Sequence, residues 1–167
     1  MTISLYTASV PAFQVSLKAL KVILQKAEAH AVAGKVDPSV YLQARLYPNM
    51  FPLVRQVQIA CDFAKGCAAR LAGIEMPKFE DNEATFADLQ ARIDKTLDII
   101  GTVKPGQIDG QEDRDIEIKA GTRTLNFKGQ AYLTGFVLPN FYFHATTAYA
   151  ILRHSGVEIG KGDFLGM

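Results

Sequence analysis

The segment "LPNFYFHATTAYAILRHSG", residues 138–156, contains two of the three histidines of the chain, His144 and His154. It is rich in aromatic and aliphatic residues and closes on a glycine, which is typical of a helix end. We therefore predict a helix over residues 139–154, with Asn140 as its N-cap. The histidines could either hold a metal ion or only pack against neighbouring helices, and the functional interpretation depends on which.

Two long segments earlier in the chain also show helical periodicity. In residues 7–30, apolar residues recur at alternating steps of three and four, which indicates one buried helical stripe. The second helix is predicted to begin near Pro48 or Pro52, since proline is tolerated in a first turn, and to end at Gly73. Small residues dominate its later half and permit close approach of a neighbouring helix.

A third helix is predicted to open at Thr85, with Asp88 three residues later in the arrangement of a capping box. Gly101 and Pro105 end it. We predict no helix in the glycine-rich tail, residues 160–166, and loops over residues 35–39 and 74–83. The predicted core positions are Val10, Phe13, Leu17, Leu20, Leu24 and Ala27 in the first helix, Val54, Val57, Cys61, Ala64, Ala68 and Leu71 in the second, and Phe86, Leu89, Ile93, Leu97 and Ile100 in the third.

Residues 105–135 follow a different pattern from the rest of the chain. The stretches DIEIK (115–119) and TRTLNF (122–127) alternate polar and apolar residues, and Ala120-Gly121 lies between them. This pattern predicts a β-hairpin. Four amphipathic helices joined by two short connections and one long one indicate an all-α four-helix bundle, with the short hairpin before the last helix. We expect residues 1–167 to form a single domain.

Three motifs carry a resemblance to a known family. "FPLVRQVQIACDFAKG" (51–66), "LPNFYFHATTAYAILRHSGV" (138–157) and "GKGDFLG" (160–166) resemble DUF1993, a family of bacterial proteins without an established activity. That family is similar to a branch of the DinB/YfiT-like superfamily of helical bundles. The resemblance implies a DinB/YfiT-like fold for the whole chain. Metal-binding members of that superfamily carry one histidine on the second helix and an HxxxH pair on the fourth. These three histidines hold zinc or nickel. Some of those relatives are transferases or isomerases that use low-molecular-weight thiols.

This chain departs from the metal-binding pattern of the superfamily. Four residues after His144 stands Ala148, and His154 lies about 15 Å further along the helix axis and on another face. The histidine of the second helix falls near Gln58 or Gln56, and a neutral amide is a weak ligand for zinc or nickel. We therefore expect no three-histidine metal site, and no cofactor.

A different kind of site can be drawn from the same helices. Gln58 and Asp62 are four residues apart on one helical face, at the edge of the apolar stripe, and a buried carboxylate needs partners. His144 and Arg55 are the natural suppliers. We predict that Arg55, Gln58, Asp62 and His144 line a ligand pocket between the second and fourth helices, where His144 acts as a base or hydrogen-bond donor. A structural polar network, with His144 as a packed buried histidine, is the alternative.

Two other classes of function stay open at this point. One is a non-catalytic structural or interaction protein that acts as a homodimer through its helix faces and hairpin. The other is a metal-dependent, thiol transferase-like enzyme that binds zinc or nickel in an altered geometry, through His144 and carboxylates such as Asp62. The sequence does not decide whether the protein is an enzyme.

Composition limits the partners and the compartment. The chain has 18 Lys plus Arg and 17 Asp plus Glu, a net charge of +1, so nothing draws it generally to nucleic acid or to anionic membranes. No apolar run is long enough to span a bilayer, and the N-terminus does not have the pattern of a signal peptide. Cys61 and Cys67 lie on opposite sides of a predicted helix and cannot form a disulfide. We expect a cytoplasmic protein that binds a small molecule and forms a homodimer, with no nucleic-acid or membrane partner.

Overall fold

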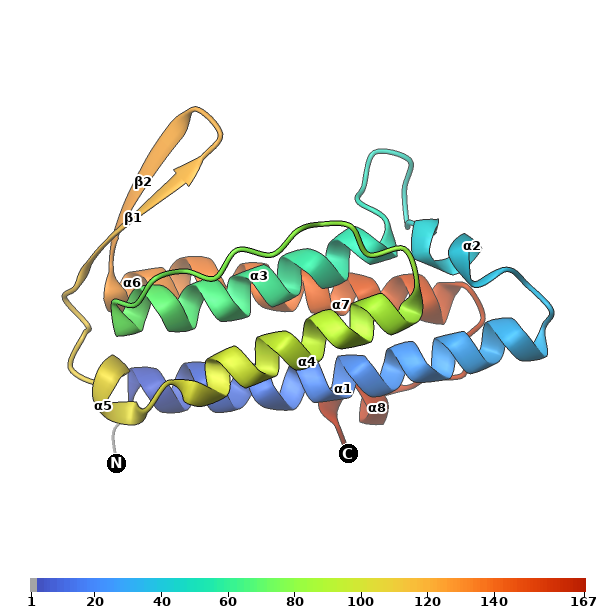
Figure 1. Ribbon diagram of the computed structural model, residues 1–167, viewed down its shortest axis with the longest axis horizontal. Coiled ribbons are helices and arrows are strands. Elements are labelled where there is room, and N and C mark those ends of the chain that lie inside the picture. Colours follow the sequence, from blue (N-terminus) through green and yellow to red (C-terminus); the bar gives the residue numbers. More distant parts are fainter. Residues whose placement is uncertain (1–2) are drawn as a thin grey trace.

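Within residues 3–167, four long helical segments run side by side along the length of the molecule (Figure 1). The computed structural model describes these residues, and only the backbone of Ala120; Met1 and Thr2 of the predicted domain lie outside the described residues. The elements are α1 (Leu5–Ala33), α2 (Pro38–Gln43), α3 (Leu53–Ala72), α4 (Phe86–Thr102), α5 (Pro105–Ile108), β1 (Asp115–Ala120), β2 (Arg123–Lys128), α6 (Gly129–Tyr132), the π-helical turn η1 (Leu133–Val137), α7 (Leu138–His154) and α8 (Lys161–Leu165).

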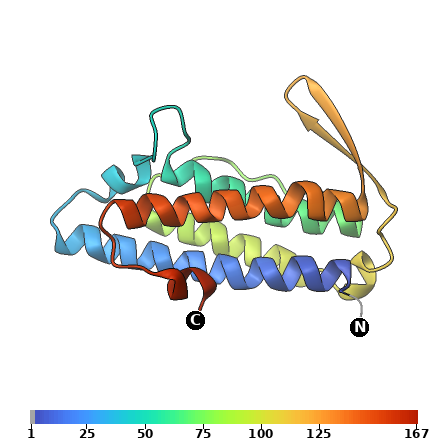
Figure 2. The same ribbon diagram turned by 180° about the vertical axis from the view of Figure 1, so that it is seen from behind.

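The four long segments are α1, α3, α4 and the continuous segment α6–η1–α7, and they surround one core. Helix α3 packs against α7 and α4, and α1 packs against α4 and α7, as the reverse view shows (Figure 2). All predicted core positions are buried except Val54 and Leu97, which are partly buried against the same core. The prediction of an all-α four-helix bundle with a hairpin before the last helix is therefore confirmed. No helix among the described residues is both long enough and apolar enough to cross a membrane.

The prediction is confirmed for both ends of α3 and for the start of α4, whereas α4 continues one residue past Gly101, to Thr102. Pro52 directly precedes α3, and Gly73 ends it with a left-handed φ of 68°, a conformation that favours glycine. The Thr85 hydroxyl accepts a hydrogen bond from the Asp88 backbone N–H at 3.1 Å, and the Asp88 carboxylate accepts one from the Thr85 N–H at 2.9 Å. This is the capping box that the sequence predicts.

The prediction for the start of the last helix was wrong. The chain is already helical from Gly129, and it passes through α6 and η1 into α7 without a break. Asn140 is therefore not an N-cap: its side-chain amide donates to the Phe136 carbonyl at 2.7 Å within the helix. Pro139 lacks an N–H to donate to the preceding turn, and the wider π-helical turn ends two residues before it, at Val137.

Two short helices replace predicted loops. Helix α2 overlaps the loop predicted at residues 35–39, because the Asp37 carboxylate caps it through the Ser39 N–H at 2.9 Å and Pro38 suits its first turn. Helix α8 forms in the glycine-rich tail, where the Asp163 carboxylate accepts from the Gly160 N–H at 2.8 Å. Local capping outweighs low helix propensity in both.

The hairpin projects from the end of the bundle at which α6 begins (Figure 1). Strands β1 and β2 are antiparallel, and the residues opposite Asp115 and Ala120 are Lys128 and Arg123. The connection is therefore Gly121–Thr122, one residue later than predicted. Between α3 and α4, residues 74–84 run back along α3 without regular structure, as predicted, and are called the strap below.

Candidate functional site

The strap is held to the bundle by a buried arginine of α4. The Arg92 side chain is only 2% exposed. One of its terminal nitrogens donates to the Glu83 carboxylate at 2.8 Å and to the Glu80 carbonyl at 3.1 Å. The other donates to Asp62 of α3 at 2.9 Å and lies 3.0 Å from the Asp81 carboxylate. A single guanidinium thus joins α3, α4 and the strap.

Three of the predicted site residues belong to this Arg92 cluster. The Gln58 side-chain amide donates to Glu83 at 2.7 Å and accepts from Arg55 at 3.1 Å, while Arg55 also pairs with Asp81 of the strap. Asp62 joins through Arg92. The arrangement of Arg55, Gln58 and Asp62 has the form of the structural polar network that the sequence left as an alternative.

Sequence reasoning missed the residue at the centre of the cluster. Arg92 directly precedes Ile93 in the apolar stripe of α4, and this position at the stripe edge was the available signal.

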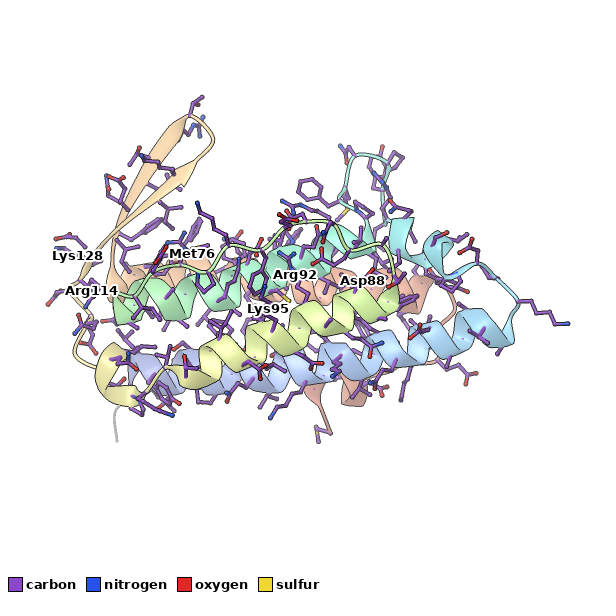
Figure 3. The ribbon with its side chains drawn as sticks, in the orientation of Figure 1. Met76, Asp88, Arg92, Lys95, Arg114 and Lys128 are labelled. Atoms are coloured by element: carbon purple, nitrogen blue, oxygen red, sulfur yellow. The ribbon has the colours of Figure 1, made fainter. Side chains whose placement is uncertain are left out.

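The ring of Phe79 on the strap also lies near three cations: the Nζ atoms of Lys65 and Lys95 at 4.4 and 4.3 Å, and the Arg92 guanidinium carbon at 5.3 Å. Figure 3 shows Arg92 and Lys95 extending from α4 toward the strap.

His144 has a different partner from the ones predicted. Its Nδ1 lies 2.7 Å from Oε1 of Gln56, not beside Gln58 or Asp62. The Gln56 amide nitrogen donates to the Phe51 carbonyl at 3.0 Å, so its oxygen must face the imidazole. His144 Nδ1 therefore carries the proton and donates it, and the lone pair is on Nε2.

The imidazole of His144 is held in its neutral form. Burial and, to a lesser extent, the positive charge of Arg55 together lower its pKa to about 4. The Phe63 ring stacks on it with centroids 6.0 Å apart, and the Phe143 ring meets it edge-on. His144 thus forms part of the packing between α3 and α7, with one basic nitrogen left without a hydrogen bond among the described residues.

The residues beside His144 do not supply the donors that the superfamily's metal site uses. Gln56 stands opposite His144, and its amide oxygen already accepts a hydrogen bond from the imidazole. One turn later in α7 is Ala148, whose side chain has no donor atom. One turn earlier is Asn140, whose side-chain amide is hydrogen-bonded to the backbone. Across residues 3–167, no three His, Cys, Asp or Glu side chains come together in a way that could hold a metal ion. One imidazole with these neighbours does not fit zinc or nickel in the three-histidine arrangement.

The two thiols are also poorly suited to nucleophilic chemistry. Cys61 and Cys67 are both buried and unpaired, as predicted. Burial raises the pKa of Cys61 to about 12 and raises that of Cys67 as well. Both sulfurs are therefore protonated at neutral pH, whereas the thiolate is the reactive form.

A cavity of about 260 Å³ lies where α3, the strap, β1 and the start of the last helix meet. Most of its wall is aromatic or aliphatic, and Asp62 is the one predicted site residue that lines it. His144 lies behind this wall, stacked on Phe63. Figure 3 shows Met76 on the strap, over α3. The lining residues are Asp62, Phe63, Arg70, Met76, Ile118, Tyr132 and Phe136.

Comparison with known proteins agrees with the fold and the motifs. A crystal structure of a DinB family member protein from Shewanella denitrificans is 42% identical in sequence, with a TM-score of 0.88, over 98% of this chain and 92% of that one. No match was found among functionally curated proteins. The model of the family described as a domain of unknown function, DUF1993, matches residues 5–165. The chain therefore belongs to the DUF1993 family and has a DinB-like fold.

Proposed function

We propose that this protein binds a small ligand in the cavity between its second and fourth long helices, and that it does so without the superfamily's three-histidine metal site. The observation that supports this is the cavity of about 260 Å³, with mostly apolar walls and a few polar groups at its edge. Ligand pockets commonly have this composition, with volumes of about 300 to 1,000 Å³. The smaller volume here favours a ligand of few heavy atoms.

The walls come from four separate parts of the chain. Phe63 belongs to α3, Met76 to the strap, Ile118 to the hairpin and Phe136 to η1. The strap and the hairpin lie outside the four-helix core, and both contribute a side chain here. Such peripheral elements can move to admit a ligand more easily than the core can.

The remaining predicted site residues have supporting roles in this proposal. Asp62 faces the ligand, whereas Arg55 and Gln58 hold the strap through Asp81 and Glu83. His144 fixes the Phe63 ring from behind, with its own orientation set by Gln56.

A tryptophan reporter tests ligand binding directly, because the chain has no tryptophan of its own. Phe136→Trp places the reporter in the cavity wall, and Tyr142→Trp places a control reporter at an exposed position of α7. Compounds from a small-molecule set that raise the melting temperature should change the emission of the first variant and leave the second unchanged. Stabilising compounds that affect both reporters equally, or a set with no stabilising compound, would count against this cavity.

Metal analysis tests the second part of the proposal. Protein purified without a histidine tag should contain far less than one zinc or nickel per chain. A stoichiometric ion that is lost on replacing His144 with alanine would overturn this part of the proposal and show a metal site with altered ligands.

A further inference from the structure

The two ends of the cavity differ in charge. Asp62 and Arg70 are eight residues apart on α3, about 12 Å along the helix axis. The Asp62 carboxylate already bonds Arg92 at 2.9 Å and Lys65 at 2.8 Å. Arg70 makes no ion pair with any described residue, and its one side-chain hydrogen bond there goes to the Tyr132 hydroxyl oxygen at 3.1 Å. The negative end is thus neutralised within the protein, whereas the positive end is not.

Tyr132 adds an unused hydrogen-bond donor at the positive end. Its side chain is 1% exposed, and its oxygen accepts from Arg70. Burial raises the pKa of Tyr132 to about 12, so the hydroxyl keeps its proton at neutral pH. Among the described residues that proton has no acceptor, and a buried donor without one costs free energy.

The backbone of α3 makes room for the guanidinium of Arg70. A Cβ atom added at Gly66 would lie 2.6 Å from Arg70 Nη1 and 3.5 Å from Met76 Cε. A glycine in the middle of a helix costs about 1 kcal/mol relative to alanine. At this position it lets the arginine fold back along the helix to the cavity, beside the Tyr132 hydroxyl.

We propose that the ligand of this cavity is a small carboxylic acid, bound as its carboxylate by the Arg70 guanidinium and the Tyr132 hydroxyl. A carboxylate accepts from both donors at once, and charge-assisted hydrogen bonds of this kind are among the strongest in proteins. The apolar body of the acid lies against Phe63, Ile118 and Phe136. The other lining residues supply no second cation, so monocarboxylates are selected over dicarboxylates. This inference rests on the proposed ligand-binding function and names its ligand class.

Matched pairs of probes separate the charge from the apolar body. Benzoate and benzamide, and hexanoate and hexanamide, are titrated into the wild-type protein by calorimetry and thermal shift. The carboxylates should bind at least tenfold more tightly than the amides. Equal binding of acids and amides would overturn the carboxylate assignment and leave the pocket intact. If neither class binds, both this inference and the proposed function fail.

Three variants test the residues, and a fourth serves as the control. Arg70→Met and Tyr132→Phe should each weaken carboxylate binding by tenfold or more and leave amide binding unchanged, whereas Arg153→Met, at an exposed arginine of α7, should change neither. Gly66→Ala should keep or raise the melting temperature of the unliganded protein, because alanine favours helix, while it displaces Arg70 and weakens carboxylate binding. Unchanged carboxylate affinity in Gly66→Ala and Arg70→Met would refute the assignment. Because Gly66→Ala is expected to remain folded, misfolding would not explain its result.

Discussion

A single imidazole links α3 and α7 through a chain of two hydrogen bonds. His144 donates to Gln56, and Gln56 donates to the Phe51 carbonyl at the entrance to α3. The first bond uses the neutral Nδ1–H, and the folded protein holds the pKa of His144 at about 4. An unfolded histidine has a pKa near 6.5. Folding therefore favours the unprotonated ring.

This difference predicts how stability depends on pH. Between pH 6.5 and pH 4 the unfolded chain binds a proton at residue 144 that the folded chain does not, so the free energy of unfolding falls as the pH falls. The contribution of His144 is complete above pH 6.5 and decreases by on the order of 3 kcal/mol by pH 4. Urea unfolding of the wild type and of His144→Gln, at a series of pH values, measures it as their difference.

The exposed histidine of α7 supplies the control. His154→Gln should preserve the pH dependence of the wild type, since His154 lies at the exposed end of the helix. A His144→Gln protein whose stability runs parallel to that of the wild type from pH 7 to pH 4 would disprove the role assigned to this ring.

At the scale of elements, the buried Arg92 guanidinium pairs with two carboxylates of the strap. Arg92→Met leaves the carboxylates of Asp62, Asp81 and Glu83 without their shared partner, and loss of one member of a buried ionic group costs about 3 to 5 kcal/mol. We expect a loss at or below the lower value. The side chains of Asp62 and Asp81 are 32% and 41% exposed, so water can solvate them, and Lys65 and Arg55 remain as their partners. Chemical denaturation measures the loss, and proteolysis should cut the strap sooner.

An exposed ion pair provides the comparison for Arg92. Lys21 of α1 pairs with Asp94 of α4 at 2.6 Å, with half of the Asp94 side chain exposed. Lys21→Met should therefore cost at most about 1 kcal/mol. Equal losses for the two variants would mean that the strap does not depend on the buried cluster.

The last helix depends on a side chain to cross its π-helical turn. The Asn140 side-chain amide donates to the Phe136 carbonyl, which lies in the π-helical turn before α7. Asn140→Ala removes that bond and should cost about 1 kcal/mol. Asn126→Ala, on the exposed face of β2, should be neutral. Faster hydrogen exchange along η1 in the first variant alone would locate the effect, and a neutral Asn140→Ala would refute it.

The elements were predictable where a local pattern decides them. The stripe from Val10 to Ala27 and the Thr85–Asp88 capping box each involve neighbours within one or two turns, and both are found in the structure. The start of the last helix was predicted wrongly because proline is common at helix starts. Here Pro139 lies inside a longer helical segment, just after a π-helical turn.

The site was predictable only in part. Arg55, Gln58 and Asp62 share a face of one helix, so their proximity follows from helical spacing. Their partners on the strap and Arg92 on α4 do not, because a segment without periodicity gives no indication of what it crosses. Arg70 was missed for the same reason: its partner Tyr132 is 62 residues away, beyond the hairpin.

At the scale of the whole molecule, the predicted homodimer needs an apolar face. Val15 and Val22 are 56% and 46% exposed and lie seven residues apart, on the same face of α1. They line a groove of about 340 Å³ together with Met167 of the tail. A second copy of the chain related by a two-fold axis would cover this face on both protomers.

Light scattering over a range of concentrations tests the dimer against the monomer. A dimer through α1 predicts twice the mass of one chain for the wild type, and a shift toward one chain in Val22→Lys, because a buried lysine at the centre of an apolar interface is costly. Val40→Lys replaces a valine that is also exposed, on α2 and away from the groove, and should leave the mass unchanged. A wild-type protein that stays monomeric at every concentration would rule out the homodimer, and a dimer unaffected by Val22→Lys would move its interface away from α1, toward the hairpin.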